Sequence, residues 1–252
     1  MLKLKHKIEY AVKIAVDFLV RNTNEAGLIN EEQDLLNHCL ATLCMVENTA
    51  TCPKQCLSHL ARYIYVDDDR MFIPFLEESK VPCNATAALI FLTTKPAWAV
   101  KFANRLLLKC DKQISSGKGH CLTLFLRLYE TTQDNKWKEA ISKLSDQIIE
   151  EKACKDIWSV YSIYSLQKIE PSPKRQEWLD RVCQTEDLDL LVYGQRDKNW
   201  EERVKQICYA RLERQIQPSD EWHAGAFRDQ DNEINLALTE KYVRTFNQIL
   251  KA

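Results

Sequence analysis

Glycine and proline are so sparse in this chain that they constrain its fold more than any other feature. The 252 residues include seven prolines and five glycines, and the glycines stand at positions 27, 117, 119, 194 and 225. Because both residue types disfavour helix interiors, helices can run through the long segments that lack them. The sequence therefore predicts an all-α protein whose helices are separated by short turns.

Apolar residues recur at helical spacing within these segments, as amphipathic helices require. One stripe of positions i, i+3, i+4 and i+7 consists of Leu36, Cys39, Leu40 and Leu43. Helices are predicted over 3–21, 31–47, 53–65, 83–92, 96–109, 118–130, 135–150, 155–167, 175–183, 199–215 and 234–251. Residues 66–72 are expected to be irregular, and only 188–192 has the alternation of a strand.

The predicted helices pair into hairpins that repeat along the chain. The second helices of successive hairpins begin near residues 31, 83, 118, 155 and 233, and a weaker one is expected near 187. Self-similarity at periods of 20 to 50 residues is typical of a solenoid or a closed array of helical units. The sequence thus predicts about six helical hairpins in a single domain over residues 1–252.

The second helices are more apolar than the first. Residues 39–46 and 85–92 are nearly uncharged on all sides, whereas 136–150 and 199–215 keep a charged face. In an open solenoid both sets of helices would be amphipathic, and a helix that is apolar all round is a buried helix. We therefore predict a closed double ring with the second helices inside and the first helices outside.

Two kinds of segment resemble a known fold. The stretch Gly119–Trp137 resembles the hairpins of α/α-toroid proteins, a class that includes terpenoid cyclases, protein prenyltransferases, lanthionine cyclases and many sugar-acting enzymes. Ala224–Phe227 and Ala26–Ile29 resemble the turn with glycine and a large apolar residue that recurs in the cyclase and prenyltransferase branch. The resemblance implies an α/α toroid that binds ligands at one end of its cavity, where the turns into the inner helices meet.

By this analogy the candidate site lies at those turns. His223, Asp229 and Asp231 are the predicted catalytic residues, because histidine titrates near neutral pH and a neighbouring carboxylate tunes it. The predicted substrate-binding residues are Trp222, Phe227, Arg228, Glu233, His120, Asp67, Asp68 and Trp158. The alternative is structural: acids before a helix cap its free N–H groups, and Trp222 and His223 would only seal the ring.

No metal or cofactor motif is complete. The run Asp67–Asp69 resembles the acidic motifs of terpene and prenyl chemistry but lacks the further aspartate of a D-x-D-D pattern. Lanthionine cyclases hold zinc with a Cys-His pair, and this chain has only the reversed order at His38 and His120. Cys52, Cys56 and His59 have a suitable spacing for zinc, but Pro53 places the first of them at a helix start. We therefore expect no metal and no cofactor.

The charge and the cysteine content of the chain limit the kinds of partner and the cellular location that we expect. Thirty-five basic and thirty-six acidic residues give a net charge of −1, which argues against a large nucleic-acid interface. Charged residues interrupt the segment 8–20, so neither a signal peptide nor a membrane span is expected. Most of the ten cysteines lie in apolar helix stripes, which predicts reduced thiols and a cytoplasmic location.

The first functional hypothesis is an enzyme that acts on a small polar, sugar-like or cyclisable substrate by acid and base chemistry. The second is a non-catalytic binding or scaffold protein of the same fold, and the third is an open helical-repeat interaction protein. All three leave the identity of the ligand and the oligomeric state open.

Overall fold

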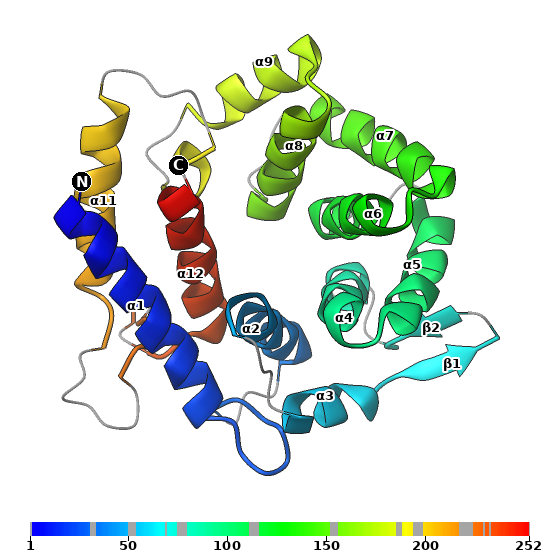
Figure 1. The fold of residues 1–252 in the computed structure, drawn as a ribbon, viewed down its shortest axis with the longest axis horizontal. Helices are drawn as coiled ribbons and strands as arrows, with labels where there is room; N and C mark the ends of the chain where they lie inside the picture. The colour runs from blue at the N-terminus through cyan, green and yellow to red at the C-terminus, as the bar shows by residue number, and fades with distance from the viewer. Residues whose placement is uncertain are drawn as a thin grey trace. The chain divides into compact units, whose positions relative to one another are not determined.

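The computed structural model describes residues 2–30, 34–49, 54–68, 70–74, 80–110, 116–151, 156–184, 188–193, 199–216, 224–228, 230–231 and 233–251. These residues form twelve helices and two short strands (Figure 1). The prediction of an all-α protein is confirmed, and the helices that glycine and proline spacing predicts are present with ends that differ by a few residues.

The chain forms two compact units. The first unit combines both ends of the sequence, residues 1–62 and 185–252, and the second consists of residues 63–184. Each unit has its own helices and its own internal packing, and each is described separately below.

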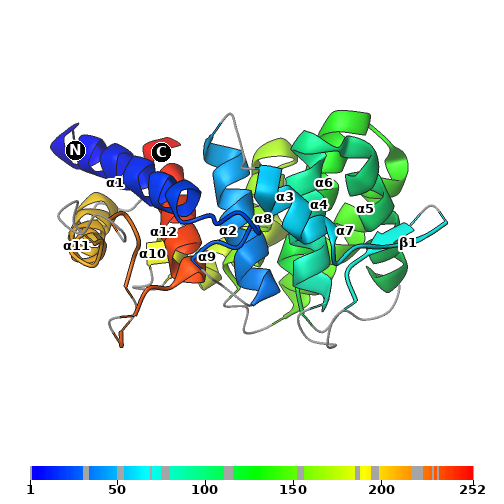
Figure 2. The same ribbon diagram turned by 90° about the horizontal axis from the view of Figure 1, so that it is seen from below.

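The second unit contains two layers of helices. One layer is formed by α4 (Lys80–Thr94), α6 (Lys118–Thr132) and α8 (Ile157–Ile169), with α6 packed against both of the others. The other layer is formed by α5 (Pro96–Cys110), α7 (Asn135–Glu150) and α9 (Pro173–Val182), which pack against α4, α6 and α8 respectively. Strands β1 (Tyr65–Asp67) and β2 (Arg70–Phe72) form an antiparallel hairpin that contacts α5 through β2 (Figure 2).

The difference in apolar pattern between the two layers follows from their burial. Helix α7 buries one face, on which Trp137, Ile141, Leu144 and Ile148 lie. Helix α6 instead buries every residue from Gly119 to Leu126. A helix that contacts neighbours on several sides must be apolar on all of them, so the uncharged segments mark the helices with the most packed neighbours.

Helices α6 and α8 approach each other closely at Gly119. A Cβ atom added to Gly119 would lie 2.1 Å from the backbone nitrogen of Ser159. Hydroxyl groups bridge the two helices at the same level: Ser162 donates to the Gly119 carbonyl oxygen at 2.8 Å, and the Thr123 and Ser162 hydroxyls lie 2.7 Å apart. The absence of a side chain at position 119 therefore sets the spacing of this helix pair.

Replacing Gly119 with alanine should force the two helices apart and lower the free energy of unfolding by about 1 to 3 kcal/mol, the usual cost of overpacking. Urea unfolding followed by circular dichroism measures this change. Ser142→Ala on α7 is a suitable control because Ser142 is exposed. An alanine at 119 that is as stable as the natural glycine would contradict the close approach.

The first unit brings helices from the two ends of the sequence together. It contains α1 (Leu2–Arg21), α2 (Leu35–Asn48), α3 (Lys54–Ala61), α10 (Leu188–Leu191), α11 (Trp200–Leu212) and α12 (Leu236–Lys251). Helix α12 packs against α1, α2 and α10, and α11 packs against α1 and α10. The weaker helix expected near residue 187 corresponds to the short helix α10, and Leu188–Leu191 is helical despite its strand-like alternation.

Hydrogen bonds from the Gln215 side chain to backbone carbonyl oxygens connect the turn before α12 to α1. The buried amide of Gln215 donates to the carbonyl oxygens of Ala11 and Gly225, at 2.8 and 3.0 Å. Gly225 has a φ of 102°, and a Cβ there would lie 1.9 Å from the Ile14 carbonyl oxygen. The glycine of the predicted Ala224–Phe227 turn is thus required both by its backbone conformation and by its contact with α1.

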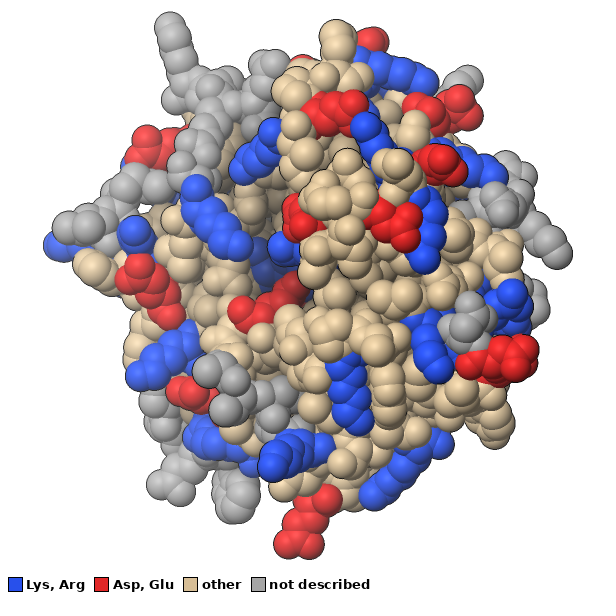
Figure 3. Space-filling model, turned by 45° about the vertical axis from the view of Figure 1, so that its right-hand side comes forward, with Lys and Arg blue, Asp and Glu red and all other residues tan. Residues whose placement is uncertain are grey.

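Three observations concern the core and the surface. Seven cysteines of the described residues are buried, at positions 39, 44, 56, 83, 121, 183 and 208. Lys and Arg side chains are interspersed with Asp and Glu on the face shown in Figure 3. Among the described residues no helix combines the length and the apolar character that crossing a membrane would need.

Candidate functional site

The two central members of the predicted catalytic set, His223 and Asp229, lie outside the described residues, as does Trp222. Asp231 is described and is exposed in a turn. The predicted acid and base chemistry at this turn therefore stays a prediction.

The other predicted residues of this stretch belong to the first unit. Phe227 is fully buried, with its ring centroid 4.9 Å from that of Tyr242 in an edge-on arrangement. Arg228 is half-buried, and Glu233 is exposed. Phe227 therefore has the contacts of a core residue that anchors the turn on α12.

In the second unit the structure brings two of the predicted residues together. His120 at the start of α6 stacks on Trp158 at the start of α8, with ring centroids 4.4 Å apart, and both side chains are buried. Asp67 and Asp68 are exposed and lie in the β1–β2 hairpin. The stacked pair consequently closes the α6–α8 contact from one end and offers little surface to a ligand.

The capping alternative applies to several acids before helices. The Asp156 carboxylate accepts from the backbone nitrogens of Trp158 and Ser159, each at 3.1 Å. Asp134 caps α7 through Lys136, and Asp34 caps α2 through Asn37. These carboxylates satisfy N–H groups that a helix start leaves free.

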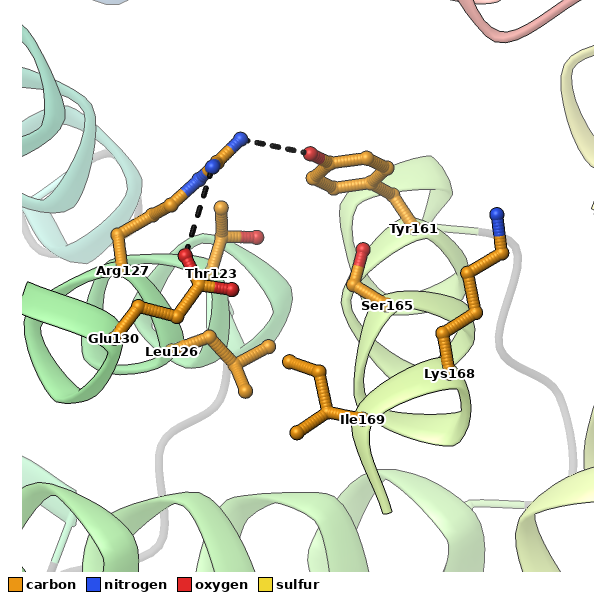
Figure 4. A pocket seen from close by; sticks show the side chains of 8 residues that line it. All are labelled: Thr123, Leu126, Arg127, Glu130, Tyr161, Ser165, Lys168 and Ile169. Atoms are coloured by element: carbon orange, nitrogen blue, oxygen red, sulfur yellow. Dashed lines mark hydrogen bonds and ion pairs between the residues drawn. The ribbon is translucent and has the colours of Figure 1, made fainter. Parts of the chain in front are cut away.

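A pocket of about 230 Å³ lies further along the same two helices, between α6 and α8 (Figure 4). Its polar side chains are Thr123, Arg127, Glu130, Tyr161, Ser165 and Lys168. Leu126 and Ile169 point toward one another at its apolar end.

Arg127 contacts two partners at this pocket. One guanidinium nitrogen donates to the Tyr161 hydroxyl at 3.4 Å, and another lies 3.6 Å from a carboxylate oxygen of Glu130. Lys168, on the other side, places its ammonium 4.3 Å from the centre of the Tyr164 ring. The pocket thus carries two cations and one carboxylate, which sum to a formal charge of +1.

The first unit contains a buried carboxylate with three partners. Asp189 of α10 is 1% exposed and pairs with Arg211 of α11, whose Nη2 lies 3.1 Å from Oδ2. Lys241 and Thr245 of α12 each lie 2.5 Å from one of its carboxylate oxygens. Burial by itself raises the pKa of Asp189, but the hydrogen bond and charge of Arg211, with Lys241 and Thr245, lower it below its ordinary value.

A second buried carboxylate in this unit behaves differently. Glu240 pairs with Arg244 at 2.7 Å, and Arg244 also lies 3.3 Å from Glu47 of α2. Burial raises the pKa of Glu240 even though Arg244 opposes the shift. Asp189 joins α10 to α11 and α12, and Arg244, which pairs with Glu240 within α12, joins α12 to α2 through Glu47, so we interpret both clusters as packing contacts of the first unit.

Two buried histidines of the first unit also contact each other. The rings of His38 and His59 have centroids 4.8 Å apart, and neither nitrogen of His38 has a hydrogen-bond partner among the described residues. Burial, followed by the charge of His59, lowers the pKa of His38 to about 4. Within the same residues no three His, Cys, Asp or Glu side chains are grouped to hold a metal ion.

Comparison with known proteins gave no match: no protein-family model matches the chain, nor does any curated protein or solved structure. The functional argument therefore rests on the side chains described above.

Proposed function

We propose that this chain is a non-catalytic binding protein that holds a small organic anion in the pocket between α6 and α8. The observation that carries the proposal is the position of Arg127 at the pocket, where its guanidinium contacts Tyr161 and Glu130 and its side chain stays 48% exposed. A guanidinium can donate two parallel hydrogen bonds to a carboxylate, so it offers an anion both charge and matching geometry.

The remaining lining residues suit the same kind of ligand. Lys168 supplies a second cation, and the hydroxyls of Tyr161 and Ser165 can donate to an anionic group. Leu126 and Ile169 offer an apolar surface at the other end, and Ile169 is 55% exposed. An anion with an apolar portion therefore finds complementary groups along the whole pocket.

Acid and base catalysis has less support among the described residues. Of the predicted groups, His120 and Trp158 are buried against each other, and Asp231, Asp67 and Asp68 are exposed on turns. Tuned catalytic groups are usually desolvated and lie beside a charged partner. We therefore propose the binding hypothesis for the described residues, and acid and base chemistry at His223 and Asp229, which lie outside them, stays a prediction.

We also infer that the hairpins close into the α/α toroid that the sequence resembles. Two observations support it, each within one unit. The helices α4, α6 and α8 are successive neighbours in one layer of the second unit, and α12 packs against α2 in the first. A closed ring requires contacts between consecutive hairpins, such as those among α4, α6 and α8. It also requires a contact between the last hairpin and the first, such as that between α12 and α2.

Binding can be tested with hexanoate and hexyl phosphate as anions and hexanol as a neutral analogue, using isothermal titration calorimetry on the full chain. Both anions should bind more tightly than hexanol. Arg127→Ala should weaken anion binding roughly 10- to 150-fold, because a hydrogen bond to a charged group contributes about 1.5 to 3 kcal/mol. The surface variant Lys138→Ala on α7 removes a matched exposed charge and should leave binding unchanged. If neither anion binds, or if Arg127→Ala binds as the natural protein does, the proposed function is wrong.

A further inference from the structure

We propose that the pocket between α6 and α8 selects a singly charged organic anion, a monocarboxylate with a short apolar chain, and that Glu130 sets this charge preference. The inference rests on the proposed function and goes beyond it by naming the ligand class and the residue that determines it. Three features of the pocket support it: its charge, the place of Glu130 and the separation of its polar and apolar ends.

The charge of the pocket favours a monoanion over a dianion. Arg127 and Lys168 bring two positive charges, and the carboxylate of Glu130 offsets one of them. The attraction of an anion to this field grows in proportion to its charge, whereas the cost of removing it from water grows with the square of its charge. A site with a small net positive charge therefore suits a single negative charge best.

Glu130 can change ligand affinity in two ways, by direct repulsion of a bound anion and through its contact with Arg127. Its carboxylate lines the pocket and lies 3.6 Å from the guanidinium. A carboxylate ligand can accept from Arg127 while Glu130 keeps its own contact, because a guanidinium has five N–H donors. A phosphate monoester at pH 8 carries nearly two charges and meets stronger repulsion from Glu130.

The apolar end of the pocket defines the rest of the ligand. The side chains of Leu126 and Ile169 face each other away from the polar groups of Arg127 and Tyr161 (Figure 4). An alkyl chain attached to the carboxylate would cover Ile169, which is otherwise largely exposed to water. Each methylene that becomes buried should tighten binding about fourfold, which corresponds to roughly 0.8 kcal/mol.

The test compares acetate, hexanoate and hexyl phosphate at pH 8 and low salt, again by calorimetry on the full chain. We expect hexanoate to bind at least as tightly as hexyl phosphate and more tightly than acetate. Glu130→Gln should improve phosphate binding more than carboxylate binding, so that the ratio of the two affinities shifts about two- to fivefold toward the phosphate, or roughly 0.5 to 1 kcal/mol. Glu139→Gln, on the exposed face of α7, is the matched control and should leave the ratio unchanged.

Ile169→Ala tests the apolar end separately. Its side chain lies on the surface at the end of α8, so the substitution should leave folding nearly unaffected. It should reduce the advantage of hexanoate over acetate. The inference is overturned if the natural protein prefers hexyl phosphate by tenfold or more, if Glu130→Gln leaves the ratio unchanged, or if acetate binds as tightly as hexanoate. In each case anions still bind, so these outcomes differ from a failure of the proposed function.

Discussion

Replacing Asp189 with alanine should lower the free energy of unfolding by about 3 to 5 kcal/mol, the usual cost of removing one partner from a buried ion pair. The substitution leaves Arg211 and Lys241 without the carboxylate that they share, and the Arg211 side chain is only 12% exposed. In a chain of this size the melting temperature should fall by roughly 6 to 20 °C. Thermal unfolding followed by circular dichroism measures the effect.

Two further variants show whether the charge of Asp189 is responsible. Asp189→Asn keeps the shape of the side chain and removes its charge, so it should lose a large part of the same stability. Asp146→Ala removes a carboxylate that is 60% exposed and 3.8 Å from Lys174, and it should change stability by less than about 1 kcal/mol. A melting temperature for Asp189→Ala within 2 °C of the natural protein would show that the buried pair does not support the first unit.

The second large effect concerns pH. His38 has a folded pKa of about 4, below its ordinary value of 6.5, so the unfolded chain takes up a proton more readily than the folded protein. Its contribution to stability is complete above pH 6.5 and is lost as the pH falls toward 4. At 1.36 kcal/mol per pKa unit, this loss is roughly 3 kcal/mol. His59, whose pKa is lowered mainly by burial and also by Arg62, should change stability in the same direction.

The buried carboxylates Asp189 and Glu240 change the stability differently from His38 between pH 7 and pH 4. Asp189, with a pKa below 3.8, loses its stabilising charge only at lower pH, and Glu240, with a raised pKa, opposes the loss from His38. The comparison that isolates His38 is therefore the pH dependence of His38→Leu against that of the natural protein, from urea unfolding between pH 7 and pH 4. The variant should lose roughly 3 kcal/mol less over this range. His6→Leu is the control, because the His6 side chain is 69% exposed; equal pH dependence of His38→Leu and the natural protein would refute the prediction.

Much of the helical framework could be predicted because its signals are local. Pro96 begins α5, Pro173 begins α9, and a glycine precedes α6 directly, so the boundaries lie close to the predicted ones. The uncharged stretches 39–46 in α2 and 85–92 in α4 correctly marked helices that are buried on nearly all sides. At α10 the local signal was ambiguous, because a weak helix was expected near 187 while 188–192 alternates as a strand does; Leu188–Leu191 is helical, with Asp189 and Leu191 buried.

The candidate pocket could not be predicted in the same way. Tyr161 lies among apolar residues of the predicted helix 155–167, and Arg127 is one of three charged residues in the mostly apolar helix α6. Periodicity shows which residues share a face, but it does not show that the faces of α6 and α8 leave a space between them. That space depends on Gly119 and Ser159, which bring the helix starts together, and on the longer side chains one and two turns later. The available signal was a few charged residues, Arg127 and Glu130 in α6 and Lys168 in α8, on two otherwise apolar helices.

The assembly of the first unit from both ends of the sequence also constrains how the chain folds during synthesis. Helices α1 and α2 pack against α12, which leaves the ribosome about 190 residues after Arg62. At a synthesis rate of about 5 to 20 residues per second, the apolar faces of α1 and α2 remain without their contact to α12 for roughly 10 to 40 s. The second unit, by contrast, is continuous and can complete its packing as soon as residue 184 has emerged. Nascent chains that stop before α12 should therefore expose the first hairpin to chaperones, while the pocket between α6 and α8 is already formed.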